Sequence, residues 1–136
     1  MQPEETDAAP ARILVMDDDP ALLTTLTTIL ASQGFEVDTA TDGAEGLAHA
    51  RERCPALVIL DALMPVLDGY AFLDAFRALP ACADVPVILM TGTRESGAAR
   101  QRLATRGVVM QIAKPFDLDT LLAAVRGALR SRQRGG

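Results

Sequence analysis

Short apolar runs alternate with longer amphipathic segments along this chain, and this alternation limits the folds open to it. Most of the runs are almost purely aliphatic, as is typical of strands buried on both faces of a sheet. The segments between them repeat apolar residues at helical spacing. Strand followed by helix, repeated along the chain, predicts one α/β domain with a parallel sheet and right-handed crossovers. The expected strands cover residues 12–16, 35–40, 56–60, 85–90 and 108–113.

Capping residues mark where several of the predicted helices begin. Asp19 precedes Pro20, which suits the first helical position, and Gly34 follows the last apolar residue of that helix. Asp117 is expected to cap the last helix in the same way. The strand at 35–40 alternates apolar with polar residues, so we expect it at an edge of the sheet. Further helices are expected at about 42–53, around 72–79 and at 95–106.

The composition suits a single soluble domain. The chain has 136 residues, 49% of them hydrophobic, which is enough for one core. No apolar run approaches the roughly 20 residues that cross a bilayer, and the acidic beginning lacks the basic and apolar parts of a signal peptide. We therefore expect a cytoplasmic protein. We expect a disordered acidic tail at 1–11, one domain at 12–131 and a short basic, glycine-ended tail at 132–136.

The net charge bears on whether the domain binds nucleic acid, and the cysteines bear on metal binding and redox state. The net charge of -5 argues against direct binding of nucleic acid by the domain. The arginines near the C-terminus suit the negative end of the last helix dipole. Cys54 and Cys82 lack the spacing of metal ligands, and each precedes a strand close to a proline. We expect both to be free thiols in a reducing compartment rather than a disulfide.

Polar side chains follow four of the apolar strands, at the point where each strand ends. Asp17 and Asp18 follow the first strand, Asp61 the third, Thr91 the fourth and Lys114 the fifth. The carboxyl ends of parallel strands lie along one edge of a sheet, and ligands of such sheets bind there. We therefore expect these five residues to converge although they are far apart in sequence.

The carboxylates of Asp17, Asp18 and Asp61, if close together at this edge, repel one another. Two like charges about 4 Å apart repel by roughly 4 kcal/mol at an effective dielectric near 20. A bound cation or proton uptake would relieve this repulsion. Oxygen ligands without His or Cys favour a hard ion, and a few carboxylates with waters suit Mg²⁺. The sequence therefore predicts a magnesium site.

Lys114 is the only lysine of the chain, beside twelve arginines. A chain so rich in arginine would be expected to use arginine wherever any cation serves. A compact ammonium group on a flexible stem can instead reach one oxygen of an anion. With Lys114 close by, Thr91 becomes a hydroxyl donor for an oxyanion or phosphoryl oxygen.

Four segments in this order and spacing resemble the receiver domain of bacterial two-component response regulators, of the stand-alone, chemotaxis-regulator-like kind. They read ILVMDDDP, VILDALMPVLDGY, VILMTGT and AKPF, and the resemblance covers residues 12–131. It implies a flavodoxin-like, doubly wound (βα)5 fold. That fold has a five-stranded parallel sheet of order 2-1-3-4-5 with helices on both faces.

The resemblance also implies a role for each acidic residue of the site. Asp61 matches the phosphoacceptor, which takes a phosphoryl group from the phosphohistidine of a sensor histidine kinase. Asp17 and Asp18 match the acidic pair that holds Mg²⁺, together with Asp61 and the backbone carbonyl of Leu63. Leu63 also occupies a position that tunes the lifetime of the aspartyl phosphate. Because its side chain cannot orient water, we expect slow self-dephosphorylation.

Three further positions complete the expected switch. Thr91 matches the hydroxyl that bonds the phosphoryl group once it is installed. Lys114 matches the cation that neutralises charge on that group during transfer. The family usually carries Tyr or Phe three residues before this lysine, and here the position holds Gln111. Switching is therefore expected to use a different side chain or to be weaker.

The expected function is a phosphorylation-switched binding module that catalyses only its own phosphotransfer and dephosphorylation. Its partners would be a sensor histidine kinase or phosphotransfer protein, and a protein target contacting the fourth helix, fifth strand and last helix. We expect a monomer or weak dimer. Whether the output is a diffusible signal, a relay step or part of a longer regulator stays open.

Two alternatives compete with this function. The first is a degenerate receiver that binds partners without phosphorylation, which Gln111 favours and the complete set of acids, hydroxyl and lysine opposes. The second is a haloacid-dehalogenase-type phosphatase, which needs a second Asp where Leu63 stands. A P-loop nucleotide binder lacks its G-x-x-x-x-G-K motif here.

Overall fold

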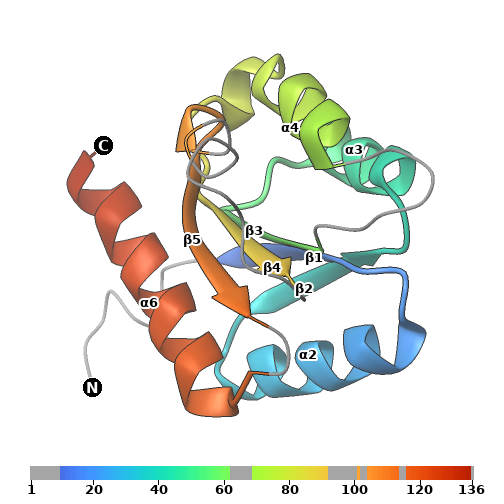
Figure 1. Ribbon diagram of the computed structural model, residues 1–136, viewed down its shortest axis with the longest axis vertical. Coiled ribbons are helices and arrows are strands. Elements are labelled where there is room, and N and C mark those ends of the chain that lie inside the picture. The colour runs from blue at the N-terminus through green and yellow to red at the C-terminus, as the bar shows by residue number, and fades with distance from the viewer. Residues whose placement is uncertain (1–9, 62–68, 92–100, 102–103, 114–115, 136) are drawn as a thin grey trace.

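Five strands pair in parallel to form one sheet with the order β2-β1-β3-β4-β5 (Figure 1). This order confirms the flavodoxin-like arrangement. The structure is a computed structural model, and it describes residues 10–61, 69–91, 101, 104–113 and 116–135. The strands are β1 (Arg12–Met16), β2 (Glu36–Ala40), β3 (Leu57–Asp61), β4 (Val87–Thr91) and β5 (Val108–Ala113).

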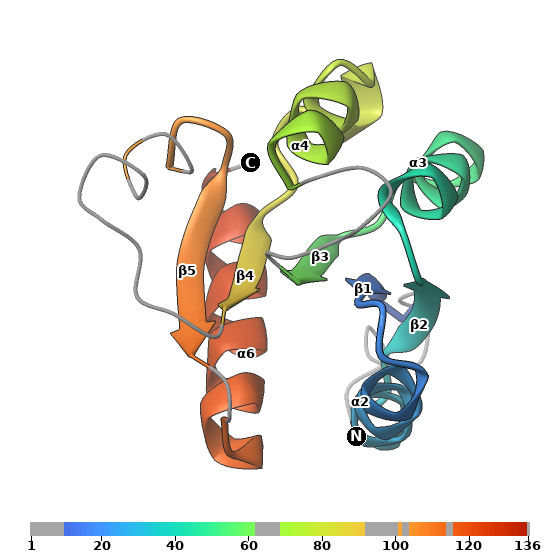
Figure 2. The same cartoon turned by 45° about the vertical axis from the view of Figure 1, so that its right-hand side comes forward.

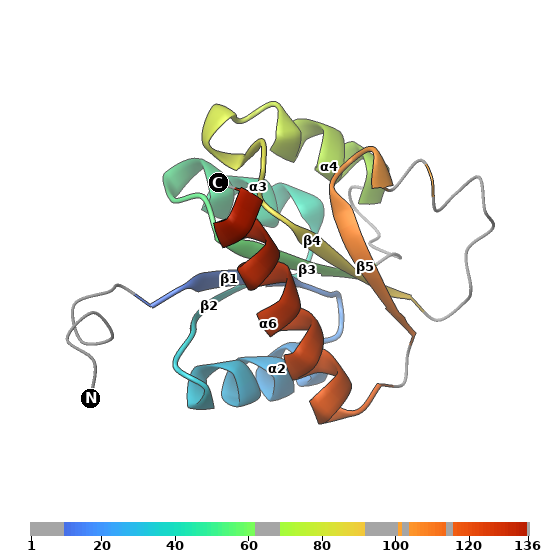
Figure 3. The same ribbon diagram turned by 90° about the vertical axis from the view of Figure 1, so that its left-hand side faces the viewer.

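Helices cover both faces of the sheet, as the doubly wound fold requires. One face carries α3 and α4, and the opposite face carries α2 and α6 (Figures 1 and 3). A short 3₁₀ helix, η1, follows α4 and leads into β4. The helices are α2 (Pro20–Ser32), α3 (Gly43–Glu52), α4 (Gly69–Arg77), η1 (Pro80–Cys82) and α6 (Leu118–Gly135).

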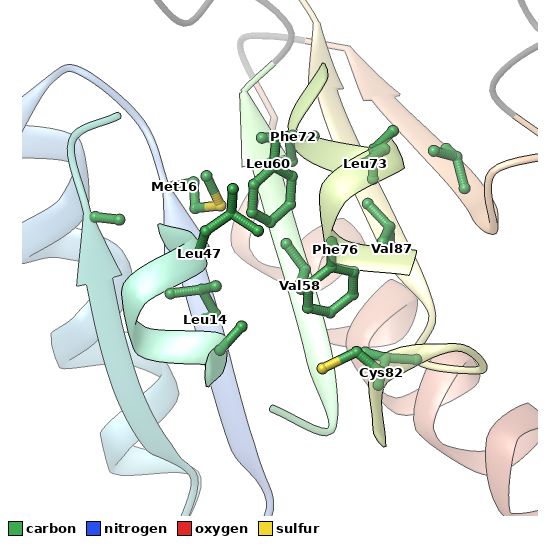
Figure 4. Close-up of a cluster of buried hydrophobic side chains, with 14 of the residues drawn as sticks. Leu14, Met16, Leu47, Val58, Leu60, Phe72, Leu73, Phe76, Cys82 and Val87 are labelled. Atoms are coloured by element: carbon green, nitrogen blue, oxygen red, sulfur yellow. The ribbon is translucent and has the colours of Figure 1, made fainter. Parts of the chain in front are cut away.

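The four apolar residues of β1 pack on two apolar clusters in alternation, because successive side chains point to opposite faces of the sheet. Leu14 and Met16 join the cluster beneath α3 and α4, which Figure 4 shows. Ile13 and Val15 join the cluster beneath α2 and α6. Both faces of the strand are thus fully buried. This is why the strand is a continuous apolar run rather than an alternating one.

The predicted helix caps are confirmed. The side chain of Asp19 accepts a hydrogen bond from the Ala21 N–H at 3.0 Å, and Pro20 occupies the first helical position. The side chain of Asp117 accepts from the Thr120 N–H at 2.7 Å at the start of α6. Each cap satisfies a backbone donor that has no partner within its helix.

The strands β2 and β5 form the two edges of the sheet (Figure 2). The edge position predicted for the strand at 35–40 is confirmed, since β2 is half-buried over most of its length. At the other edge, β5 exposes Val109 (54%) and Met110 (42%). The helix expected at 95–106 falls mostly outside the described residues, as does most of the N-terminal tail. The last helix continues to Gly135, into the segment expected to be a tail, because Arg and Gln are good helix formers.

The expectation of free thiols was wrong. Cys54 and Cys82 form a disulfide, with their Cα atoms 5.8 Å apart and a separation of 28 positions in sequence. Cys54 lies between α3 and β3, and Cys82 lies between α4 and β4. Because β3 and β4 are neighbours and both helices cover the same face, the two connections meet at one end of the sheet.

None of the helices in the described part of the chain combines the length and the hydropathy needed to cross a membrane.

Candidate functional site

Three aspartates gather at the carboxyl ends of β1 and β3. Met16 pairs with Leu60 in the sheet, so Asp17, which directly follows β1, and Asp61, the last residue of β3, lie at the same level. One carboxylate oxygen from each of Asp17, Asp18 and Asp61 lies within 4.8 Å of the other two. Asp17 and Asp61 are buried, at 0% and 6% exposure, whereas Asp18 is exposed. The predicted convergence of the acids is therefore confirmed.

Backbone groups hold Asp17 in place within this cluster. Its N–H donates to the carbonyl of Ala40, at the end of β2, over 3.1 Å. Its carboxylate Oδ1 accepts from the Asp19 N–H at 2.9 Å. Asp19 thus orients Asp17 with its backbone while its side chain caps α2. The first role was not predicted from the sequence, although an Asp that accepts from the N–H two residues on is a common local motif.

Close packing beneath the acids supports the end of β1. Met16, directly before Asp17, is fully buried among Leu47, Leu60 and Phe72 (Figure 4). A Cβ atom on Gly46 of α3 would lie 2.6 Å from the terminal methyl of Met16. The glycine therefore allows α3 to approach the strand that carries the acidic pair.

Thr91 lies beside this cluster on the next strand. Asp61 pairs with Met90, so Thr91 stands one residue further along β4, where it is 5% exposed. Thr91 in turn pairs with Ala113, the residue that precedes Lys114. The register of the sheet thus brings the expected hydroxyl to the acidic edge. Lys114 and Leu63 themselves lie outside the described residues.

The donor set fits a hard divalent cation. All three clustered side chains are carboxylates, and their oxygens are close enough to share one ion. At the observed spacing the repulsion between two of these charges ranges from about 1 kcal/mol in water to about 3 kcal/mol at lower dielectric. A divalent ion would offset this repulsion, so the residues present suit Mg²⁺.

Gln111 occupies the middle of the edge strand β5. It pairs with Leu89 of β4 and is half-buried. Its predecessors Val109 and Met110 are exposed, and a bulge interrupts the ladder between Val108 and Met110. The position expected to act in switching therefore adjoins an exposed apolar surface.

A match to a family model shows which protein family this chain belongs to. The family model of the response regulator receiver domain matches residues 13–126, nearly the whole folded part of the chain. The chain belongs to this family. The receiver resemblance drawn from the four sequence segments is therefore confirmed.

Two similar transcriptional regulators are about twice as long as this chain. The transcriptional regulatory protein PrrA of Mycobacterium leprae is 41% identical over 128 residues, which is 94% of this chain and 54% of PrrA. The DNA-binding dual master transcriptional regulator RpaA of Synechocystis is 35% identical over 123 residues, which is 90% of this chain and 51% of RpaA. The receiver thus spans about half the length of the curated relatives it matches.

Solved structures of single receivers match the fold over nearly their full length. The chemotaxis protein CheY4 of Vibrio cholerae superposes with a TM-score of 0.82 at 31% identity, covering 88% of this chain and 99% of CheY4. A CheY-like receiver domain protein from Methanospirillum hungatei gives 0.83 at 29% identity, covering 93% of this chain and 99% of the other.

Proposed function

We propose that Asp61 of this receiver accepts a phosphoryl group from the phosphohistidine of a sensor histidine kinase. The observation that carries this proposal is the approach of Asp17, Asp18 and Asp61 to within 4.8 Å, next to Thr91. In the transfer, a carboxylate oxygen of Asp61 bonds to phosphorus as the bond to the histidine nitrogen breaks. The electron pair of that bond stays on the imidazole.

Each remaining residue has a distinct part in this transfer. Asp17 and Asp18, with Asp61 and the Leu63 carbonyl, would hold Mg²⁺. Bound there, the ion would offset negative charge on the phosphoryl group. The ammonium of Lys114 pairs with a phosphoryl oxygen, and the hydroxyl of Thr91 donates to another once the bond to Asp61 has formed. The chain thereby catalyses only its own modification.

The output is a change in protein binding in the cytoplasm. The exposed Val109 and Met110 on β5 supply apolar contact area beside Gln111, and the neighbouring α6 would complete the described part of this surface. The name of RpaA includes DNA binding, which is in tension with the expectation that nucleic acid is not a direct partner. That name describes a protein about twice as long. We assign the receiver itself a protein partner because its net charge is -5.

Incubation with Mg²⁺ and acetyl phosphate tests the proposal, with intact mass as the readout. One phosphate adduct is expected on the wild-type chain and none on Asp61→Asn. Glu52→Gln removes an exposed carboxylate at the last residue of α3, which leads into the start of β3 and so lies away from the acidic edge, and it should label like the wild type. Absence of the wild-type adduct, with both variants folded, would favour the degenerate binding module instead.

A further inference from the structure

The disulfide lies at the end of the sheet opposite the acidic site. Cys54 precedes β3 and Cys82 precedes β4, whereas Asp61 and Thr91 stand at the other ends of these strands. In Figure 4, Cys82 lies at one end of the apolar cluster and Met16 lies toward the other. The cysteines are therefore separate from the residues assigned to phosphoryl transfer.

The two cysteine residues differ in their exposure to solvent. Cys82 is fully buried in the cluster beneath α3 and α4, at 0% exposure. Cys54 is half-buried and packs against the margin of that cluster. A reagent from solvent therefore reaches Cys54 first, and Cys82 can react only within the protein.

The bond closes a loop around the segment that carries the phosphoacceptor. Between Cys54 and Cys82 lie all of β3, which ends in Asp61, and all of α4. Closing such a loop removes conformational freedom from any state in which the segment opens or unfolds. Oxidation of the two cysteines to a disulfide should therefore oppose local opening of both β3 and α4.

Arg77 connects the Cys82 turn to the start of β5. Its Nη1 donates to the Cys82 carbonyl at 2.7 Å, and its Nε donates to the Arg106 carbonyl at 2.9 Å. The guanidinium also stacks over the Phe76 ring, 5.3 Å from its centroid. Burial lowers the pKa of Arg77 from its ordinary value, an effect that Asp84 opposes. The last turn of α4 is thereby tied to both the disulfide turn and the turn into β5.

We propose that Cys54 and Cys82 form a reversible thiol–disulfide site that reacts with small disulfides and dithiols through Cys54. A Cys54 thiolate attacks a small disulfide, forms a mixed disulfide and releases one thiol. The Cys82 sulfur then attacks the Cys54 sulfur and releases the second thiol. The protein loses two protons and two electrons, and the small disulfide is reduced to two thiols. A dithiol reverses both steps.

Oxidised glutathione tests the order of attack. Wild-type protein, first reduced, should lose the mass of two hydrogen atoms and become resistant to maleimide. Cys82→Ala should retain one glutathione on Cys54, because the second step is then blocked. Cys54→Ala should remain unmodified while folded, since Cys82 is buried. Equal adducts on the two variants, or free thiols in the treated wild type, would overturn the proposal.

Hydrogen exchange tests the structural consequence on the full chain. Amides of α4 and η1 should exchange about tenfold more slowly in the oxidised protein than in the reduced protein, because the closed loop opposes local opening. Amides of α2, on the opposite face, serve as the internal control and should not change. Equal exchange in α4 for both states would refute the effect on this segment. Both readouts are independent of Asp61 phosphorylation.

Discussion

The guanidinium group of Arg77 fills the space that a side chain on residue 107 would occupy. Gly107 has a φ of +84°, and a Cβ atom there would collide with Nη2 of Arg77. The glycine precedes β5, and its carbonyl accepts from the Val87 N–H at 3.1 Å. The turn into β5 and the last turn of α4 therefore depend on one another.

Gly107→Ala should destabilise the protein by about 2–4 kcal/mol, because it adds this collision to the cost of a positive φ. Gly34→Ala is the matched control: Gly34 also has a positive φ, +93°, but a Cβ there would have no neighbour within 4 Å. Its cost should be about 1 kcal/mol. Urea unfolding measures both. Equal losses would show that Arg77 yields to the added methyl group without cost.

Asp18→Asn should stabilise the metal-free protein by about 1 kcal/mol, because it removes one of three clustered negative charges while Asp18 remains exposed to water. The same change should abolish most of the stabilisation by added MgCl₂, which we expect to be about 1–3 kcal/mol in the wild type. Urea unfolding with MgCl₂ or with EDTA measures both effects. A variant that responds to Mg²⁺ as the wild type does would contradict the assigned ligand set.

The cap of α6 should make a pH-dependent contribution to stability. The backbone N–H of Thr120 lowers the pKa of Asp117 below its ordinary value of 3.8, with further help from the Thr120 side chain and the Asp119 N–H. Because the folded state favours the charged form, the stabilisation is fully present above the unfolded pKa. It is lost as the pH falls through the lowered folded value.

Asp117→Ala should therefore lower the Tm at neutral pH, and the difference from the wild type should shrink once the pH falls below about 4. Thermal unfolding followed by circular dichroism across this range measures the effect. A Tm difference that stays constant down to the most acidic pH would mean that Asp117 acts through packing rather than charge.

Gln111→Tyr should change the affinity for the output partner, or the dependence of that affinity on phosphorylation. Gln111 is half-buried on the edge strand beside the exposed Val109 and Met110, so a larger side chain there alters this surface. Titration of the unphosphorylated and phosphorylated forms against the partner measures both quantities. Identical values for the variant and the wild type would remove Gln111 from the switch.

The aspartyl phosphate should be long-lived, because the apolar Leu63 cannot orient an attacking water molecule. Loss of the phosphate adduct from purified protein, followed by intact mass after removal of the phosphodonor, measures the lifetime. Leu63→Asn, which adds a polar group at this position, should shorten it. A wild-type half-life of seconds or less would contradict the prediction.

Local patterns in the sequence were sufficient to predict the strands and helices of the described residues and the clustering of the three aspartates. Continuous apolar runs indicated strands buried on both faces, and Ile13 to Met16 are indeed buried on alternate sides. Carboxylates at strand ends predicted a shared edge, and Asp17, Asp18 and Asp61 meet there. Such predictions succeed because strand alternation and helix caps depend on neighbours within a few residues.

Only the tertiary structure decided which connections meet at the opposite end of the sheet. Cys54 and Cys82 gave no local signal of pairing, and they meet because β3 lies beside β4 with α3 and α4 on one face. The same applies to Arg77, which contacts the carbonyl of Arg106 29 residues away. Contacts of this kind depend on the order of the strands and on the side of the sheet that each helix covers. Residue spacing along the chain does not encode either property directly.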